Sequence, residues 1–529
     1  MRQGRPATLA RHGMVAAPHY LAAQAGLDLL KAGGNAVDAA IAASATLQVV
    51  YPFVCGLGGD VFMLLYDAAS GHLHGLNGSG RAARGASIAA LREQGHAQMP
   101  TYGIHTVTVP GCADGWGMAA TRFGKLGLAA ALQPAIQYAE AGFAVGPDLH
   151  SALTRMSAAE VAHPSWRAHF TPTGTVPAIG EVVRFPTLAA SYRAIAAEGA
   201  AAFYRGDLAA TMADFFAREG GFITREDLAE HHGDWVQPLS VRYAGHDIYE
   251  LPPNTQGITA LQMLGMLDGL PLGATALDPQ TLHAEIEAKK LAFADRDAYL
   301  TDPTHMRIDP QALIAPDYLA ARRSLIDLTR AAPSVAPGGF TGDTVYLCAA
   351  DEAGNVVSLI QSNYMGFGSG VVVDGTGIVL QNRGAYFSLD PSHTNALVGG
   401  KRTLHTLIPS LALRDGKPSV VFGSMGGDGQ PQTHAQVYTA VLRYGLNMQA
   451  AIELPRWVHG AEEGHETVRV EERLPSASSD GLRALGHDVQ SVAAWDPMMG
   501  YAQGITFDAA NGVMSGGSDP RAEGCAAGW

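Results

Sequence analysis

The chain has 529 residues, of which 47% are hydrophobic and 16% are charged, and this composition is typical of a folded globular protein rather than a disordered one. Its formal net charge of −14, with no run of Lys or Arg, argues against nucleic acid or an anionic membrane as the main partner. A small-molecule substrate is the better expectation.

Location is indicated by three further features of the composition. No segment has the roughly 18 consecutive apolar residues of a membrane helix, and no apolar stretch of signal-peptide length follows the first arginines. The four cysteines are far apart and form no C-x-x-C pair: Cys55, Cys112, Cys348 and Cys525. We therefore expect reduced core thiols in a cytoplasmic protein.

The first elements are read from "LAAQAGLDLLKAGGNAVDAAIAASATLQVV", residues 21–50. Apolar residues at helical spacing lie on both sides of "GG", which predicts a helix, a glycine stop and a second, buried helix that starts near Asn35. "GLGGD" (Gly56–Asp60) then leads into "VFMLLYDAASGHLHGLN", which is typical of a β-hairpin.

Residues 124–328 have a mostly helical, Ala-rich pattern, and the character of the sequence changes after residue 330. "RAAPSVAPGGFTGD", residues 330–343, is predicted to be an exposed linker, and short β-rich runs such as "TVYLCAA" and "NVVSLIQS" follow it. We place the main boundary between Asp343 and Thr344, which divides the chain into residues 1–343 and 344–529.

Familiar catalytic motifs are missing from the sequence. It contains no G-x-S-x-G, H-E-x-x-H or G-x-x-x-x-G-K-[ST] motif, and no Cys/His set at zinc spacing. "GLGGD" has no dinucleotide fingerprint around it, and the adjacent histidines of "EHHGDW" point in different directions on any regular element. We therefore expect neither a metal nor a cofactor, although a metal-dependent hydrolase stays open as an alternative.

Thr344 is the candidate nucleophile. A threonine hydroxyl needs a base, and the threonine's own α-amino group, with a pKa of about 7.7 to 8.0, can act as one once the preceding chain is removed. Such a residue must follow a cleavable segment and open a strand, and Thr344 meets both conditions. The alternative is that "GDT" is only a turn and Thr344 an ordinary β-branched strand residue.

Two other segments favour a catalytic role. In "FGSMGGDGQPQTHAQVYTAVLRYG" a strand end is followed by glycines and a helix, so the N–H groups of Gly426 and Gly427 could stabilise an oxyanion. In "IQSNYMGFGSG" Ser362 and Asn363 end the strand that returns from the one that Thr344 begins. A short turn at "DEAGN" brings Ser362 back beside Thr344.

These residues resemble the γ-glutamyltransferases, self-cleaving N-terminal nucleophile hydrolases. The resemblance runs over nearly the whole chain, in the family's order, through "GGNAVDAAIAA", "GLGGD", "VPG", "FYRGDLA", "GGFITREDLAEH", "EAKKLAFADRDAYLTDP", "GDT", "GSMGG" and "GSDPR". It implies an α+β fold, a four-layer αββα sandwich. It also implies cleavage between Asp343 and Thr344 into a large, mostly helical subunit and a small subunit that share one core.

Residue by residue, the resemblance implies that Thr344 cleaves the precursor and then forms the acyl-enzyme. Ser362 matches the supporting hydroxyl, and Gly426 and Gly427 match the oxyanion-hole pair. A homodimer of such heterodimers is a further expectation.

The substrate pocket departs from the family's pattern. In "NGSGRAARG" Ser79 stands where the family has an Arg for the substrate's α-carboxylate, and Arg81 is displaced by two positions. In the remaining pocket segments, this sequence has other residues at or near the positions where the family has acidic residues and serines: Arg383, Tyr386, His405 and Thr406. Because a desolvated ammonium group needs acceptors, this set is better suited to anionic or neutral acyl groups, with Asn363 as a further contact.

The expected function is amide hydrolysis through an acyl-enzyme on Thr344, with γ-glutamyl amides such as glutathione as the first substrate class. Small amides such as oxamate compete with them, and cephalosporin acylases are related as well. From a different class, a processed but inactive binding protein is the remaining alternative.

Overall fold

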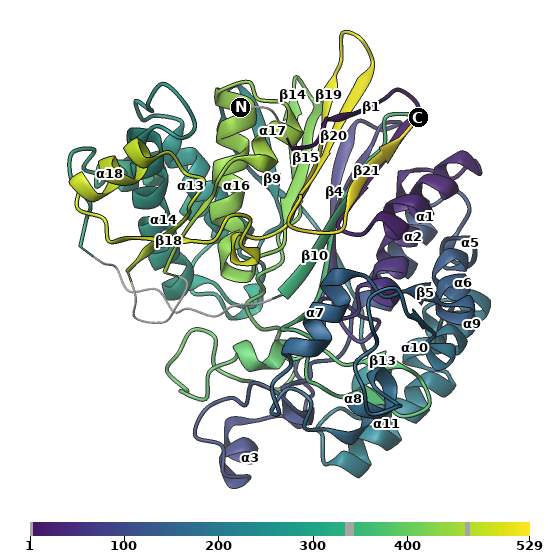
Figure 1. Ribbon diagram of the computed structural model, residues 1–529. Coiled ribbons are helices and arrows are strands. Elements are labelled where there is room, and N and C mark those ends of the chain that lie inside the picture. Colours follow the sequence, from purple (N-terminus) through teal and green to yellow (C-terminus); the bar gives the residue numbers. More distant parts are fainter. Residues whose placement is uncertain (1–3, 334–342, 461–465) are drawn as a thin grey trace.

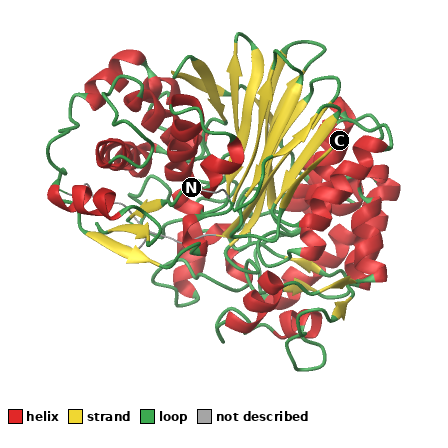
Figure 2. Ribbon diagram, turned by 45° about the horizontal axis from the view of Figure 1, so that its top comes forward, coloured by secondary structure: helices red, strands yellow, loops and turns green. Residues whose placement is uncertain are grey.

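The computed structural model describes residues 4–333, 343–460 and 466–529. Two large β-sheets pack face to face, and helices cover the outer face of each sheet (Figure 2). This arrangement is the αββα sandwich that was expected. Most of the predicted linker, residues 334–342, lies outside the described residues.

Each sheet has seven strands. In spatial order, the first sheet consists of β1 (Thr8–Ala10), β20 (Val513–Ser518), β19 (Ala502–Asp508), β15 (Lys417–Ser424), β14 (Ser410–Arg414), β9 (His246–Glu250) and β8 (Leu239–Tyr243). The second consists of β21 (Cys525–Gly528), β2 (Gly13–Ala17), β10 (Asp343–Asp351), β11 (Val356–Tyr364), β3 (Asp60–Asp67), β4 (His72–Gly78) and β7 (Asp234–Val236). Both sheets therefore combine strands from before and after Thr344.

The helices form two outer layers (Figure 1). Against the second sheet lie α1 (Tyr20–Lys31), α2 (Ala36–Val50), α4 (Cys112–Phe123), α5 (Leu128–Ala131), α6 (Gln133–Ala141), α9 (Pro186–Glu198), α10 (Ala201–Tyr204) and α11 (Asp207–Glu219). Against the first lie α13 (Gly257–Leu267), α14 (Pro279–Tyr299), α15 (Pro316–Arg323), α16 (Gln430–Tyr438) and α17 (Met448–Glu453).

The remaining elements are short and lie around this sandwich. The helices are α3 (Ile88–Glu93), α7 (Pro147–Arg155), α8 (Pro164–Phe170), α12 (Arg225–Ala229) and α18 (Ser476–Ala484). The strands are β5 (Phe143–Ala144), β6 (Val182–Val183), β12 (Val372–Val373), β13 (Ile378–Val379), β16 (Trp457–His459), β17 (Val468–Glu471) and β18 (Val489–Val492).

The apolar core has three layers, and side chains of β10 alternate between two of them. Val345 and Leu347 point into the core beneath α1 and α2, whereas Tyr346 and Cys348 point between the two sheets. Because a central strand of a sandwich is buried on both faces, its sequence is continuously apolar rather than alternating. The third core lies between the first sheet and α13–α17.

Several local predictions are confirmed. The glycine stop separates α1 from α2, and Asn35 caps α2 by accepting hydrogen bonds from the backbone N–H groups of Val37 and Asp38. The hairpins β3–β4 and β10–β11 form as expected. The mostly helical interpretation of residues 124–328 missed the strands inside this stretch, which are the short pair β5–β6, the edge strand β7 and the hairpin β8–β9.

All four cysteines are free thiols, and only Cys525 is partly exposed. Within the described ranges, none of the helices combines the length and the apolar character that crossing a membrane requires.

Candidate active site

Thr344 lies near the start of β10, one residue inside the strand. β10 pairs with β11 in antiparallel register, but the register shifts between Asp343 and Val345. A local irregularity of this kind re-aims the side chain that it contains. The hydroxyl of Thr344, which is only 2% exposed, donates a hydrogen bond to Ser362 Oγ at 3.4 Å.

Ser362 connects the nucleophile candidate to the end of β11. Its Oγ also accepts a hydrogen bond from the backbone N–H of Tyr364 at 2.7 Å, so the serine hydroxyl is held from two sides. Asn363 is buried next to it, but its amide packs against Gly56 and Gly59. Neighbouring residues of a strand point to opposite faces, so Asn363 does not share the face of Ser362.

The glycine turn predicted to bind an oxyanion follows β15 directly. Gly426 has φ +136° and Gly427 has φ +51°, which are backbone conformations that glycine adopts readily. Gly423, at the end of β15, lies against the ring of Tyr346, two residues from Thr344. The turn thus comes from the sheet that faces the nucleophile candidate, and α16 begins immediately after it at Gln430.

Side chains from three separate segments fix this turn. Asp428, the residue after Gly427, is hydrogen-bonded to Arg296 of α14 and accepts a second hydrogen bond, at 2.9 Å, from the hydroxyl of Tyr386. Gln256 donates to the carbonyl of Gly427 at 2.9 Å and accepts from Arg296 at 3.0 Å. The position of the two glycines therefore depends on residues that are far apart in the sequence.

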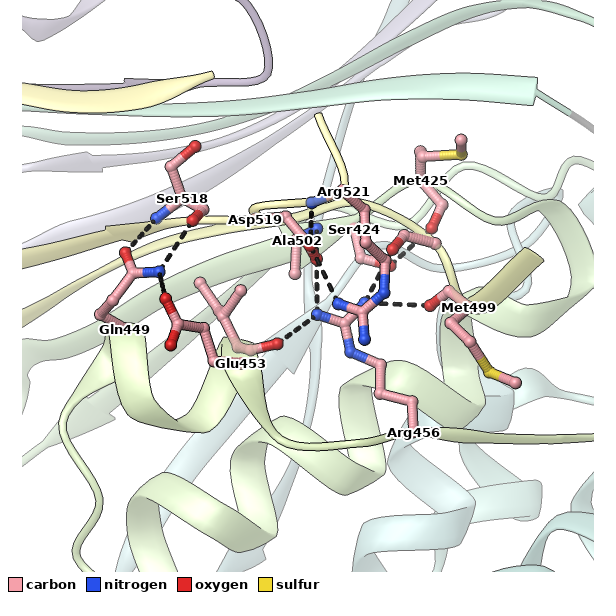
Figure 3. Close-up of polar contacts among 12 residues, drawn as sticks. Ser424, Met425, Gln449, Glu453, Arg456, Met499, Ala502, Ser518, Asp519 and Arg521 are labelled. Carbon is pink, nitrogen blue, oxygen red and sulfur yellow. Dashed lines mark hydrogen bonds and ion pairs between the residues drawn. The ribbon is translucent and has the colours of Figure 1, made fainter. Parts of the chain in front are cut away.

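A buried ionic network lies behind the turn (Figure 3). Arg456 donates to the carbonyls of Met499 and Gly500, at 2.9 and 2.8 Å, and to Asp519 at 2.6 Å. Gly500 packs against Gly426 and Met425, so this network supports the turn. Asp519 belongs to "GSDPR", one of the motifs on which the family resemblance was based.

Arg383 is the most unusual charged group near the nucleophile candidate. Its side chain is 1% exposed, and its guanidinium lies over the ring of Tyr364, 4.2 Å from the centroid. One nitrogen, Nη1, donates to Thr406 Oγ1 at 3.2 Å, whereas Nε and Nη2 have no partner among the described residues. Burial lowers the pKa of Arg383 to about 10, so the group stays charged at neutral pH.

His405 binds a carboxylate that the sequence analysis did not select. Its Nε2 is hydrogen-bonded to Asp60 Oδ2 at 3.1 Å, and Asp60 Oδ1 accepts from the backbone N–H groups of Gly80 and Gly111 and from Gln381. Burial raises the pKa of Asp60 to about 6. Burial, reinforced by Arg383, lowers the pKa of His405 well below its ordinary value, so its imidazole is neutral.

Ser79 and Arg81, two predicted substrate contacts, have other partners. Ser79 Oγ donates to Asn77 Oδ1 at 2.7 Å within a buried amide cluster. Arg81 forms an ion pair with Asp234 at 3.6 Å and lines a separate cavity of about 300 Å³ together with His231. Neither contact of Arg81 involves Arg383, and a substrate-binding role for Ser79 or Arg81 stays a prediction.

One group of three potential metal ligands occurs among the residues that the structure describes: His283, Glu287 and His487. His283 Nδ1 is hydrogen-bonded to His487 at 2.7 Å, and its Nε2 to the carbonyl of Asp327 at 2.8 Å. Glu287 accepts from the ammonium group of Lys290 at 2.7 Å. Because these ligand atoms already have partners and a cation is adjacent, the group is better explained as a buried hydrogen-bond cluster.

Sequence reasoning missed five residues around the predicted ones: Asp60, Gln256, Tyr364 and Asp428 contact predicted residues directly, and Arg296 is connected to them through Gln256 and Asp428. Four of them lie inside quoted segments: Asp60 in "GLGGD", Arg296 in "EAKKLAFADRDAYLTDP", Tyr364 in "IQSNYMGFGSG" and Asp428 in "FGSMGGDGQPQTHAQVYTAVLRYG". A charged residue inside a glycine-rich motif was the available signal, but its partner could not be read from the sequence.

Comparisons with known proteins identify the family of this chain. A model of the family described as gamma-glutamyltranspeptidase matches residues 22–529. The chain is 40% identical to the glutathione hydrolase-like YwrD proenzyme of Bacillus subtilis, covering 97% of this chain and 98% of that protein. It is 41% identical to the oxamate amidohydrolase proenzyme of Klebsiella pneumoniae, covering 98% of each.

A solved structure with a similar fold supports the same family. The crystal structure of cephalosporin acylase from Bacillus halodurans superposes with a TM-score of 0.93 and 43% sequence identity, covering 100% of this chain and 98% of that one. The match of the family model and the nearly full-length similarity to proenzymes leave one assignment: the chain belongs to the gamma-glutamyltranspeptidase family of enzymes.

Proposed function

We propose that this chain is a threonine amidohydrolase that first cleaves itself between Asp343 and Thr344 and then hydrolyses amides through an acyl-enzyme on Thr344. The observation that carries the proposal is the hydrogen bond from Thr344 Oγ1 to Ser362 Oγ, at 3.4 Å, near the start of β10. The names of two relatives as proenzymes support the processing step.

In the processing step, Thr344 Oγ attacks the carbonyl carbon of Asp343. The peptide bond breaks as an ester forms, and the nitrogen of Thr344 becomes a free amine. Water then hydrolyses the ester, which leaves a carboxylate on Asp343 and a free hydroxyl on Thr344. The new amino group has a pKa near neutrality in ordinary peptides, so it can serve as the base that the hydroxyl requires.

In turnover, this amine takes the proton of Thr344 Oγ as the oxygen attacks the substrate's amide carbon. The N–H groups of Gly426 and Gly427 stabilise the oxyanion, and the proton passes to the leaving amine. Water then attacks the acyl-enzyme and releases the acid. Ser362 orients the nucleophile in both half-reactions.

For the substrate, γ-glutamyl amides such as glutathione and small amides such as oxamate share this chemistry. The name of the Bacillus subtilis relative favours the first class, and that of the Klebsiella pneumoniae relative favours the second. The geometry supports the second class better, because a buried cation, Arg383, lies against the ring of Tyr364, the residue whose backbone N–H donates to Ser362. A cephalosporin-acylase-like activity has the support of the similar solved structure.

Denaturing electrophoresis and intact mass test the reaction. We expect wild-type protein to give fragments 1–343 and 344–529, Thr344→Ala to stay full length, and Thr344→Ser, which keeps the hydroxyl, to be cleaved. A full-length wild-type chain at all ages of the preparation, or a Thr344→Ala chain cleaved at this bond, would overturn the proposal.

Two assays on the processed enzyme test the substrate class. Release of the anilide from a γ-glutamyl anilide is compared with release of ammonia from oxamate. Rapid oxamate hydrolysis with no anilide release eliminates the glutathione class, and the opposite result eliminates the oxamate class.

A cytoplasmic location and a homodimer of heterodimers complete the proposal. The four free cysteines support the first, because exported proteins usually pair their thiols. Cell fractionation tests the location, and light scattering of the processed enzyme tests the assembly.

A further inference from the structure

We propose that Arg383 binds a carboxylate on the acyl group of the substrate, so that the enzyme hydrolyses half-amides of short dicarboxylic acids rather than amides of α-amino acids. This inference rests on the proposed function, because it names the substrate class of the same site. It assigns to Arg383 a contact that neither the nucleophile nor the oxyanion turn requires.

The hydrogen bonding of Arg383 is incomplete. A guanidinium carries five N–H donors, and the described residues offer one acceptor, Thr406 Oγ1. Nε and Nη2 are buried without a partner within the described part of the chain. The planar fork of an arginine is suited to a carboxylate, which can accept two parallel hydrogen bonds.

The charge of Arg383 is also uncompensated at close range. The two nearest carboxylates, Asp60 and Asp428, form no ion pair with Arg383 within the described residues. Asp60 accepts hydrogen bonds from four other donors, and Asp428 is bonded to Arg296 and Tyr386. Burying an ion without a partner is unfavourable, and the ring of Tyr364 offsets only part of this cost. A bound anion supplies the rest.

The position of Arg383 connects it to both parts of the proposed machinery. Tyr364 donates its backbone N–H to Ser362 Oγ, and its ring carries the guanidinium on one face. On the other side, Gln256 donates to the carbonyls of both Thr406 and Gly427, at 2.9 Å each. Tyr364 thus contacts both the proposed anion site and the serine that supports the nucleophile.

The contacts and charge of Arg383 define the substrate class. An acyl group that reaches from Thr344 to Arg383 is short and ends in a carboxylate. An α-ammonium group at the same place is disfavoured, because it meets the cation of Arg383 instead of a free carboxylate.

Oxamate and oxamide form a matched pair for the test, since they have nearly the same size but only oxamate carries a carboxylate. We expect wild-type enzyme to have a kcat/KM for oxamate on the order of 100-fold higher than for oxamide. In Arg383→Met the ratio should fall to about threefold or less, and Arg383→Lys should recover part of it because lysine keeps the charge without the fork. Succinamate and succinamide extend the comparison to a longer acyl group.

Two controls separate this inference from the proposed function. Arg193→Met, an exposed arginine of α9 that is paired with Glu140, should leave the ratio unchanged, and electrophoresis shows whether each variant has cleaved itself. If no amide is turned over, calorimetry with oxalate and succinate still tests the site: binding that Arg383→Met abolishes supports the inference. Equal turnover of oxamate and oxamide by the wild type, or dicarboxylate binding that is absent or independent of Arg383, overturns it. Loss of Thr344-dependent cleavage overturns only the proposed reaction.

Discussion

Arg296 of α14 is hydrogen-bonded to Asp428, the residue directly after the two candidate oxyanion glycines. The side chain of Arg296 is 1% exposed, and Tyr386 donates to the same carboxylate oxygen of Asp428. The contact joins a helix of residues 1–343 to a turn of residues 344–529. It therefore couples the position of the oxyanion turn to the other proposed subunit.

Asp428→Asn tests this coupling. The variant leaves the buried cation of Arg296 without its carboxylate at the turn, so we expect kcat to fall about 10- to 100-fold while KM changes less than about threefold. Steady-state kinetics on the substrate that the wild type hydrolyses measures both values. Asp297→Asn is the matched control: Asp297 accepts from Nε of the same arginine at 2.8 Å, but it is more exposed and lies on α14 itself. An equal loss in the two variants would assign the effect to Arg296 alone.

Gly426→Ala tests the backbone geometry of the turn. Alanine rarely adopts φ +136°, so the substitution should displace the turn and lower kcat by at least about 100-fold. Gly429→Ala is the control, since Gly429 has φ −73° and open space where a Cβ would lie. Its kcat should be within about twofold of the wild type. Normal turnover by Gly426→Ala would exclude this turn as the oxyanion site.

Ser362→Ala removes the hydroxyl that accepts from Thr344. We expect slower self-cleavage and a kcat about 10- to 100-fold lower, because the nucleophile loses its orientation. Ser358→Ala, one serine earlier on the same face of β11, removes a 2.8 Å hydrogen bond with Tyr346 instead. It should cost on the order of 1 kcal/mol of stability without affecting turnover. Time courses of cleavage and chemical denaturation distinguish the two variants.

Lys289 predicts a pH-dependent stability. Burial, with Arg296 as a smaller contributor, lowers the pKa of Lys289 to about 7, and its ammonium group donates to His459 Nδ1 at 3.2 Å. In the unfolded chain this lysine holds its proton up to about pH 10.4. At and below pH 7 the buried charge therefore lowers the free energy of unfolding, and this destabilisation disappears as the pH rises from 7 towards 10.

Lys289→Met removes this penalty. We expect the variant to exceed the wild type in free energy of unfolding by on the order of 3 to 5 kcal/mol at pH 7, with a difference that shrinks towards pH 10. Denaturant unfolding at several pH values measures it. The neighbouring Lys290→Met should destabilise instead, because Lys290 is paired with buried Glu287 at 2.7 Å. A destabilised Lys289→Met, or a difference independent of pH, would contradict the assignment.

The sequence was sufficient to predict the structural elements that depend on residues close together in the chain. The break between α1 and α2 follows from the two glycines and Asn35, and the β10–β11 hairpin, which returns Ser362 to Thr344, follows from two apolar runs around a short turn. The β8–β9 hairpin was not predicted, because the sequence on both sides of it is rich in helix-forming residues.

Contacts between distant segments could not be predicted in the same way. Asp60 meets His405, and Arg296 meets Asp428, across sheets and layers that a linear pattern does not order. The role expected of Arg81 came from its place in a motif, whereas the structure gives it Asp234 as a partner.

The interleaving of strands in both sheets has a consequence for assembly. β10 lies between β2 and β11, and β9 lies between β8 and β14, so each proposed fragment lacks the hydrogen-bonding neighbours that its own edges need. Separately produced fragments should thus expose unpaired strand edges and aggregate, whereas a cleaved precursor should melt in a single transition. In the proposed processing, the continuous precursor therefore lets both sheets form before the bond between Asp343 and Thr344 is cut.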